Sequence, residues 1–299
     1  MRTSQTNSIL ISLLLPTRNR PALVARLFDS INATAANCGR IEVILYIDDD
    51  DVASHQLDSN VFEVVRIIGP SLSMGEYNSA GLARARGEII VLANDDMVIR
   101  TIGWDNALIR ADALIDDGIY LAYANDLIKK GGLSTFPILS RRTCTLLVDP
   151  YPAVYRGACI DTHLFDTFQR LLHAGFDRIV YLDEVVFEHL HFRAGKAPAD
   201  DTYRRRGRFD DDATFVGLAE SRRMNAVRLA EAIRGNPLPP TRTIPGEVVV
   251  PTGLMHAIAH FTRKSMLDGG LPWRWRWYLW YRFFGGYLIT RGLLRRFLR

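Results

Sequence analysis

The sequence predicts an α/β protein with a mostly parallel sheet flanked by helices. Short, continuous apolar runs recur through the first half of the chain, and such runs are typical of strands buried on both faces. Segments with apolar residues at helical spacing separate these runs, which is the alternation of β–α units. With 299 residues, of which 48% are hydrophobic and 23% charged, the chain can bury a large core without cross-links. This composition excludes a disordered, collagen-like or disulfide-scaffold protein.

The first β–α unit begins close to the N-terminus. Residues 9–15 form an apolar run that we expect to be a strand, since no small-residue cleavage site of a signal peptide follows it. Pro21 suits the first turn of a helix, and Leu23, Leu27 and Ile31 follow at helical spacing.

The next elements continue the pattern and place polar clusters at two strand ends. Strands are expected at residues 41–47, 61–68, 88–93 and 120–123, and helices at 73–86 and 103–117. An acidic cluster at residues 48–51 follows the second strand, and a second cluster at 94–96 follows the fourth. Because ligands of such sheets bind beyond the carboxyl ends of the strands, these clusters predict the functional site.

The second half of the chain is predicted to complete the same domain. Residues 124–160 are mixed, and they precede a helix over 161–174, strands over 178–182 and 185–191, and a long helix over 210–234. Residues 236–253 hold five of the thirteen prolines and are predicted to be a linker. We therefore expect a domain of residues 1–235, this linker, and a C-terminal tail of residues 254–299.

The predicted tail carries the excess positive charge of the chain. Residues 254–299 contain eight Arg and one Lys against one acid, so the tail has a net charge of +8 and the rest of the chain −4. A mildly acidic body argues against nucleic acid as a partner. The three cysteines form no CxxC pair, which fits a reducing compartment and argues against a structural zinc site.

Aromatic and basic residues alternate in this tail. Residues 273–284 read WRWRWYLWYRFF, and rings interleaved with guanidinium groups suit the headgroup region of a membrane. The alternative is a helix that packs its aromatic side chains on the body. No run of about 18 uncharged apolar residues exists, so no membrane-spanning helix is expected. We expect a cytoplasmic protein that is peripheral on the inner face of the membrane.

The cluster of Asn94, Asp95 and Asp96 directly follows an apolar strand. Carboxylates on a strand-end loop are hard oxygen ligands for Mg²⁺ or Mn²⁺, and such an ion neutralises a diphosphate. The alternative is an ordinary surface turn rich in Asp and Asn. The position at a strand end favours a site.

Five motifs in order resemble family 2 glycosyltransferases of the GT-A fold. They are the first strand with PTRNR at 16–20, the second strand with DD at 48–49, NSAG at 78–81, ARGEII at 85–90 and NDD at 94–96. The resemblance covers about residues 8–192. It implies a GT-A (Rossmann-like) fold with a donor-binding half of about residues 8–123 and an acceptor half of about 124–235. It also implies inverting, metal-assisted transfer of a hexosyl group from a nucleotide diphosphate sugar to an acceptor hydroxyl.

The resemblance implies a donor site around the two polar clusters. Its expected members are Pro16, Thr17, Arg18, Asp48, Asn78, Asn94 and Asp95. Asp48 would accept the N3–H of a uracil or thymine, so a UDP-sugar is the favoured donor, although guanine also presents N–H donors. Arg18 and Arg20 would meet diphosphate oxygens, and their alternative is an exposed loop charge.

The resemblance also implies that Asp96 and His189 bind the metal. Asn94 stands where the family carries the first carboxylate of Asp-x-Asp, so the contact is expected from Asp96, with Asp95 as a helper. The strand that ends at His189 matches a family segment whose histidine reaches the diphosphate-bound metal, and imidazole is a common metal ligand. The alternative is a hydrogen-bonded core histidine.

A catalytic base is expected near the start of the helix over 161–174. An inverting transfer needs a group that takes the proton of the acceptor hydroxyl, and the resemblance implies Asp166 or Asp161. The family's Glu-Asp pair would align near His163, which is a second departure from its pattern. The alternatives are a helix N-cap for Asp161 and an ion pair with Arg170 for Asp166.

Arg156 and Gly157 resemble the family's acceptor loop, where glycine lets a sugar approach the backbone. With the tail at a membrane, the expected acceptor is a glycan or a lipid-linked molecule of cell-envelope polysaccharide synthesis.

Two other functions stay open. Asn94 and the missing Glu-Asp pair keep open a non-catalytic glycan- or nucleotide-binding protein. A nucleotidyltransferase is the other, although no Gly-rich loop with a basic residue follows the first strand.

Overall fold

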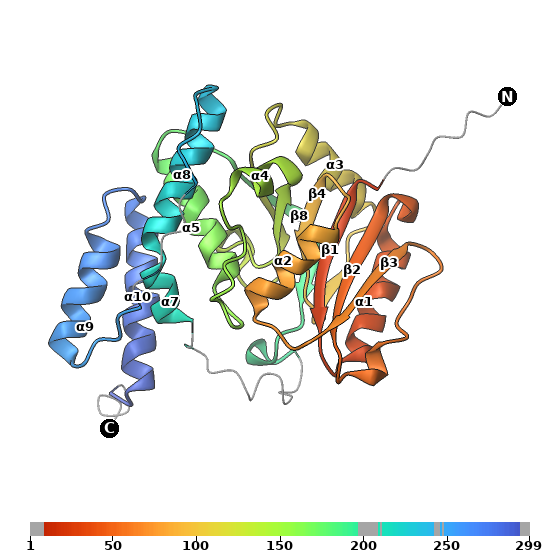
Figure 1. The fold of residues 1–299 in the computed structure, drawn as a ribbon, viewed down its shortest axis with the longest axis horizontal. Helices are drawn as coiled ribbons and strands as arrows, with labels where there is room; N and C mark the ends of the chain where they lie inside the picture. Colours follow the sequence, from red (N-terminus) through yellow and green to blue (C-terminus); the bar gives the residue numbers. More distant parts are fainter. Residues whose placement is uncertain (1–8, 197–208, 210, 242–245, 247, 294–299) are drawn as a thin grey trace.

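The computed structural model describes residues 9–196, 209, 211–241, 246 and 248–293. In these residues it shows one mixed sheet of eight strands with helices on both faces (Figure 1). The strands lie in the order β3-β2-β1-β4-β7-β6-β8-β5. Their bounds are β1 Ile11–Thr17, β2 Ile41–Asp48, β3 Glu63–Gly69, β4 Ile89–Leu92, β5 Met97–Ile99, β6 Leu121–Asn125, β7 Pro137–Ser140 and β8 Ile179–His189. The predicted α/β architecture is confirmed.

Strands β1 to β4 form the parallel part of the sheet. β1 lies between β2 and β4, with Ile11 opposite Ile41 on one side and Ile89 on the other. β2 also pairs in parallel with β3. Every residue of β2 and β4 is buried, as expected for apolar runs that are covered on both faces. The carboxyl ends of these strands therefore meet at one edge of the sheet.

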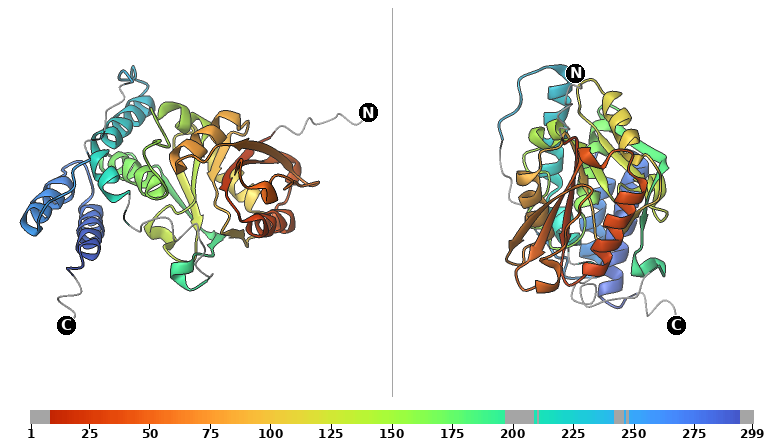
Figure 2. Two further views of the ribbon diagram at one scale, coloured as in Figure 1. Left: turned by 60° about the horizontal axis from the view of Figure 1, so that its bottom comes forward. Right: turned by 90° about the vertical axis from the view of Figure 1, so that its right-hand side faces the viewer.

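Helices cover both faces of the sheet, each over its own hydrophobic core (Figures 1 and 2). One core takes in α1 (Pro21–Thr34) and α3 (Trp104–Ala113), and the other takes in α2 (Met74–Arg84), α4 (Arg141–Leu146) and α5 (Ile160–His173). Pro21 opens α1 as predicted. A capping box of Ser73 and Glu76 opens α2, because each side chain binds a backbone N–H at the other residue.

The second half of the sheet differs from the sequence prediction. β7 pairs antiparallel with β4, and the three-residue β5 pairs antiparallel with β8. β8 is a single strand where the pattern predicts two. The predicted helix over 210–234 is divided at Leu218 into α7 (Asp212–Gly217) and α8 (Ala219–Arg234). Strand pairing across the sheet depends on distant residues, so local periodicity does not report it.

The segment predicted to be a tail packs against the body (Figure 2). α9 (Leu254–Phe261) continues into a π-helical turn (Thr262–Met266), and α10 (Trp273–Thr290) packs beside them. The apolar side chains of α10 that join the same core as α5 and α8 are Trp275, Leu279, Phe283 and Tyr287. One face of α10 is therefore a structural part of the domain.

The other face of α10 carries an exposed aromatic stripe. Trp273, Trp277 and Tyr281 are 58%, 47% and 76% exposed, and they recur at every fourth residue on one side of the helix. The packing on the body that the sequence offers as one alternative is therefore present, and the open aromatic face leaves membrane binding as a prediction. Among the described residues, no helix is long and apolar enough to cross a membrane.

Candidate active site

Three buried carboxylates gather at the carboxyl edge of the parallel strands. Asp48 ends β2, and Asp95 and Asp96 follow β4. Each of these residues is at most 5% exposed. A buried charge is costly unless it is paired, and the partners of this cluster come from the loop after β1, from α2 and from β8.

Asp48 is held by one arginine and one tyrosine. Arg18 Nη1 lies 3.0 Å from Asp48 Oδ2, and its Nη2 lies 2.6 Å from a carboxylate oxygen of Asp50. Tyr77 of α2 donates its hydroxyl to Asp48 Oδ1. Burial, reinforced by this hydrogen bond, raises the pKa of Tyr77, so the phenol keeps its proton. The carboxylate of Asp48 is therefore oriented from two elements.

Asp95 has a strongly perturbed carboxyl group at this edge. Arg20 Nη1 lies 2.9 Å from its Oδ1, and Thr17 donates its hydroxyl to Oδ2 at 3.1 Å. Burial raises the pKa of Asp95 to about 6, although Arg20 opposes the shift. Strongly perturbed groups of this kind concentrate at functional sites.

Asp96 and His189 meet across the junction of β5 and β8. The register places Met97 opposite His189, and the Asp96 carbonyl accepts the backbone N–H of Leu190 at 2.9 Å. The side chains touch as a result, with His189 Nε2 at 3.1 Å from Asp96 Oδ2. This is a hydrogen-bond distance, so the hydrogen-bonded histidine named as the alternative is present. A carboxylate oxygen and an imidazole nitrogen are also the kinds of atom that bind a divalent ion. The described residues contain no cluster of three such ligands.

The other residues predicted for the donor site have local roles in this structure. Pro16 lies in β1 opposite Tyr46. The buried Asn78 donates its amide to the Met74 carbonyl inside α2 at 2.9 Å. Asn94 is half-buried, and its carbonyl accepts the Met97 N–H in the turn between β4 and β5.

The loop predicted to bind the acceptor is shaped by a buried aspartate. Asp211 accepts the backbone N–H groups of Arg156, Gly157 and Ala158 at 3.0, 2.9 and 2.7 Å. Cys159 then takes a left-handed conformation, with φ of +68°, and leads into α5. Such a conformation is unfavourable for a side chain other than glycine, and it persists where the surroundings enforce it.

Asp161 lies in the first turn of α5, directly after this loop. Its Oδ1 accepts the N–H and the hydroxyl of Thr162, and Cys159 takes the N-cap position that is the alternative for Asp161. Burial raises the pKa of Asp161, while Arg282 and His189 act in the opposite direction. A half-buried carboxylate with a raised pKa, in electrostatic range of His189, has the properties of a general base.

Asp166 has a different environment from Asp161. It is fully buried, and Arg170 and Arg222 approach its Oδ2 to 2.9 and 2.6 Å. Trp275 of α10 donates its indole N–H to Oδ1 at 2.8 Å. Both oxygens are thus engaged in joining α5, α8 and α10. The i, i+4 ion pair named as the alternative for Asp166 is present, and no oxygen faces solvent to receive a substrate proton.

Three residues of this region have no predicted role in the sequence analysis. Tyr77 lies next to the predicted Asn78, and Asp211 lies in the acidic run at 210–212. The neighbouring residues in the sequence could therefore have identified both as candidates. Arg282 of α10 donates to the Cys159 sulfur at 3.1 Å and lies 3.7 Å from Asp212. It is 123 residues distant from Cys159 along the chain, and only the packing of α10 reveals its place.

Comparisons with known proteins inform the fold. No protein-family model and no curated protein matches this sequence. The solved structure of TarS 1-349 from S. aureus is similar, with 14% identity and a TM-score of 0.53 over 96% of this chain and 92% of that chain. The same fragment in complex with UDP-GlcNAc matches with 13% identity and a TM-score of 0.50 over the same shares. The chain therefore shares the α/β fold of the TarS fragment, which is consistent with the GT-A fold that the sequence motifs imply.

Proposed function

We propose that the protein is an inverting glycosyltransferase that moves a sugar from a nucleotide diphosphate sugar to an acceptor hydroxyl. The observation that carries this proposal is the buried cluster of Asp48, Asp95 and Asp96, with Arg18 and Arg20 beside it, at the carboxyl edge of the sheet. That edge binds ligands in open sheets of this class. The TarS fragment, which shares the fold, was solved with UDP-GlcNAc.

Asp48 is assigned to the base of the donor nucleotide. A buried carboxylate oriented by Tyr77 and Arg18 is suited to accept the N3–H of uracil, so we favour a UDP-sugar. Arg18 and Arg20 project from the loop after β1 and are assigned to the diphosphate, since a guanidinium fork matches phosphate oxygens. Both arginines now contact carboxylates of the site, and the diphosphate would take over part of that pairing.

Asp96 and His189 are assigned to Mn²⁺ or Mg²⁺. Asp96 Oδ2 and His189 Nε2, which lie 3.1 Å apart, would offer one oxygen and one nitrogen ligand, and phosphate oxygens of the donor would offer others. The bound ion would supply charge neutralisation for the diphosphate as it leaves. The protein residues around it hold the two ligands in place through the β5–β8 register.

Asp161 is assigned as the base in place of Asp166. It follows the loop of Arg156 and Gly157, where we place the acceptor, and burial raises its pKa, which makes the carboxylate a stronger proton acceptor than an exposed aspartate. In an inverting reaction the acceptor oxygen attacks the anomeric carbon as Asp161 takes its proton, and the bond to the diphosphate breaks on the opposite face. Asp166 holds the helices behind this loop.

The aromatic stripe of α10 supports a place at a membrane surface. Exposed Trp and Tyr side chains with neighbouring arginines are characteristic of the headgroup region. We therefore propose a peripheral protein on the cytoplasmic face, with a glycan or lipid-linked acceptor in cell-envelope polysaccharide synthesis.

The test is release of nucleotide from a panel of UDP-, GDP- and dTDP-sugars in the presence of Mn²⁺. We expect turnover of one donor class, and we expect Asp96→Asn to lower it by about a hundredfold or more. Asp177→Asn, which removes an exposed carboxylate on a loop, is the matched control and should retain turnover. If a nucleotide binds but no donor is turned over, whichever acceptor fraction is added, the non-catalytic alternative would be favoured.

A further inference from the structure

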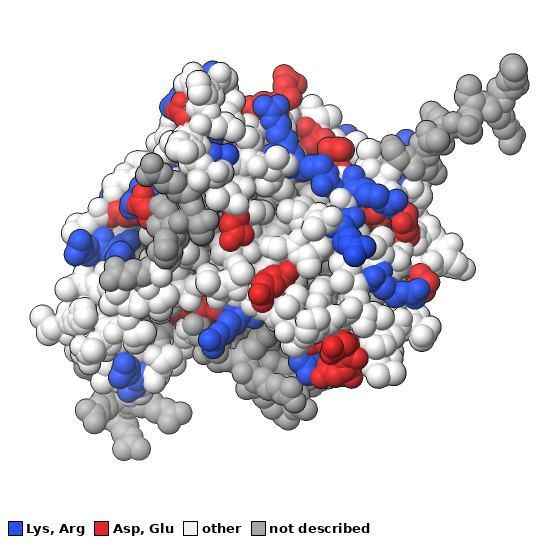
Figure 3. All heavy atoms as spheres, viewed as in Figure 1, with Lys and Arg blue, Asp and Glu red and all other residues white. Residues whose placement is uncertain are grey.

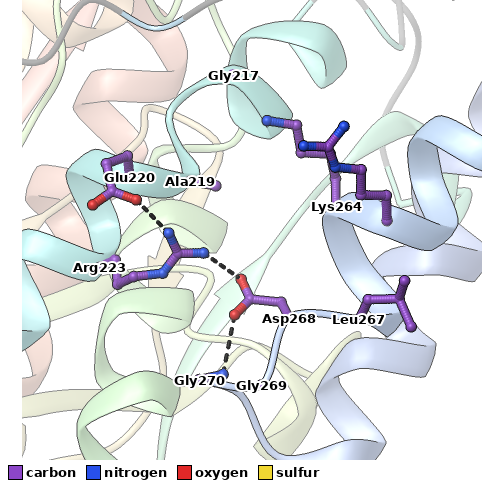
Figure 4. Close-up of a pocket in the computed structure, with 10 residues that line it drawn as sticks. Gly217, Ala219, Glu220, Arg223, Lys264, Leu267, Asp268, Gly269 and Gly270 are labelled. Carbon is purple, nitrogen blue, oxygen red and sulfur yellow. Dashed lines mark hydrogen bonds and ion pairs between the residues drawn. The ribbon is translucent and has the colours of Figure 1, made fainter.

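A polar pocket lies between the start of α8 and the turn that joins α9 to α10 (Figure 4). Its volume is about 450 Å³. The residues that line it are Gly217, Ala219, Glu220, Arg223, Arg263, Lys264, Leu267, Asp268, Gly269 and Gly270. None of them belongs to the candidate active site.

The charges in this pocket do not balance. Arg223 pairs with both acids of the pocket, Glu220 and Asp268, and its Nη2 lies 3.3 Å from Asp268. Figure 4 shows Lys264 on the side of the pocket opposite to Arg223. Arg263 and Lys264 have no acidic partner among the described residues. The charged residues of the lining, three basic and two acidic, therefore have a net charge of +1, and Arg263 and Lys264 are the two cations outside the ion pairs. Basic side chains, with acidic ones beside them, lie on this face of the molecule near α9 (Figure 3).

The backbone presents these two cations in an unusual way. Arg263 and Lys264 lie in the π-helical turn, in which the Leu267 N–H reaches the Thr262 carbonyl at 3.0 Å. Trp280 of α10 fixes this turn through an indole hydrogen bond to the Thr262 hydroxyl at 3.1 Å. Single π-helical turns are frequent at functional sites. Glycine and alanine form much of the remaining wall, so the pocket is free of bulky side chains there.

Exposed apolar side chains lie on α9 and on the turn that follows it. Leu267 lines the pocket and is 72% exposed, and Met255 of α9 is 77% exposed. Trp273 begins the aromatic stripe only three residues after Gly270. A free phosphate needs cations alone, whereas a lipid headgroup lies at a surface where apolar side chains also gain from burial. This combination favours the lipid.

We propose that this pocket binds the phosphate of an anionic phospholipid through Arg263 and Lys264. The inference rests on the membrane association proposed above and adds its specific contact. It makes lipid binding depend on headgroup charge and not on the aromatic stripe alone.

The test is sedimentation of the full chain with vesicles of phosphatidylcholine, made with and without phosphatidylglycerol. We expect binding to require phosphatidylglycerol and to weaken about tenfold or more in Arg263→Ala/Lys264→Ala, since each cation near an anionic surface contributes to binding. Lys129→Ala/Lys130→Ala removes the same charge from an exposed turn on another element and should bind as the wild type does.

Two further readouts separate the possible results. Calorimetric binding of UDP is measured on every variant, so a failure of nucleotide binding with intact vesicle binding would contradict the catalytic proposal alone. Equal vesicle binding by the two double variants would contradict the proposal that the pocket binds the lipid. Stabilisation of the wild type by inorganic phosphate, with no binding to either kind of vesicle, would also overturn it, because the ligand would then be a free anion.

Discussion

At the scale of single residues, the two aspartates of α5 differ because of where their side chains lie. Asp161 is half-buried beside the acceptor loop, and Asp166 is enclosed by Arg170, Arg222 and Trp275. The sequence places them five residues apart on one helix and cannot separate them, because their partners come from α8 and α10.

The exchange of each aspartate for asparagine tests this difference. We expect Asp161→Asn to lower turnover by about 100- to 10,000-fold and to leave nucleotide binding and stability unchanged, because only the proton acceptor is lost. We expect Asp166→Asn to lower the free energy of unfolding by about 3–5 kcal/mol, because the buried Arg222 loses its counter-charge and the buried Arg170 keeps only Asp268. Transfer assays and urea unfolding of both variants measure these effects. A stable Asp166→Asn protein without turnover would reverse the two assignments.

A buried histidine makes stability depend on pH. His163 is buried, its Nδ1 lies 2.9 Å from the Tyr155 hydroxyl, and burial together with Arg222 holds its pKa well below the ordinary value. Below about pH 6.5 the unfolded chain binds a proton that the native state does not. The free energy of unfolding therefore decreases as the pH is lowered, by up to about 1.4 kcal/mol for each pH unit. Above that pH this contribution is complete and constant.

Urea unfolding between neutral and mildly acidic pH measures this effect. We expect the acid-side slope to be smaller in His163→Gln than in the wild type, since the variant has no imidazole to titrate. His173→Gln, at an exposed position on the same helix, should keep the wild-type slope. Identical slopes in all three proteins would show that His163 is protonated equally in both states.

At the scale of elements, α10 has two faces with different tasks. Its packed face carries Trp275, whose indole N–H completes the pairing of Asp166. Its open face carries Trp277, which is nearly half exposed. The aromatic pattern of the sequence allows two interpretations, binding at a membrane interface and packing on the body. The packed face confirms the second, and membrane binding by the open face stays a prediction.

Two conservative exchanges on this helix separate the faces. We expect Trp275→Phe to destabilise the protein by about 1–3 kcal/mol, because a buried carboxylate oxygen loses its donor. Trp277→Phe should change stability by no more than about 0.5 kcal/mol, because its side chain is at the surface. Thermal or urea unfolding compares the two. Equal effects would mean that α10 does not pack in the orientation described here.

The sequence predicts a strand correctly where burial requires a continuous apolar run. It misses a strand that forms only through pairing with a distant segment. β1, β2 and β4 are continuous apolar runs, and the sequence predicts each of them within a few residues. β5 has three residues and is stabilised by pairing with β8, some ninety residues further along the chain. No local pattern of that length distinguishes a strand from a turn. The contact of Asp96 with His189 depends on this pairing.

At the scale of the whole molecule, the C-terminal helices complete the domain. The sequence suggests an independent tail because residues 236–253 are rich in proline and the charge changes sign after them. Yet Trp275, Leu279 and Phe283 share a core with α5. A change in composition marks a boundary along the chain. It does not reveal a shared core, because the packed surfaces come together only in the folded structure. Arg282 reaches Cys159 for the same reason.

The central claim is that the carboxyl edge of the sheet binds a nucleotide diphosphate with a divalent ion. The most direct measurement is calorimetric titration of UDP, GDP, dTDP and CMP with and without Mn²⁺, on the wild type, Asp96→Asn and the exposed-site control Asp177→Asn. We predict that UDP binds, that Mn²⁺ strengthens its binding, and that Asp96→Asn alone loses the metal effect. Absence of binding by every nucleotide, or a metal effect that persists in Asp96→Asn, would contradict this account of the site.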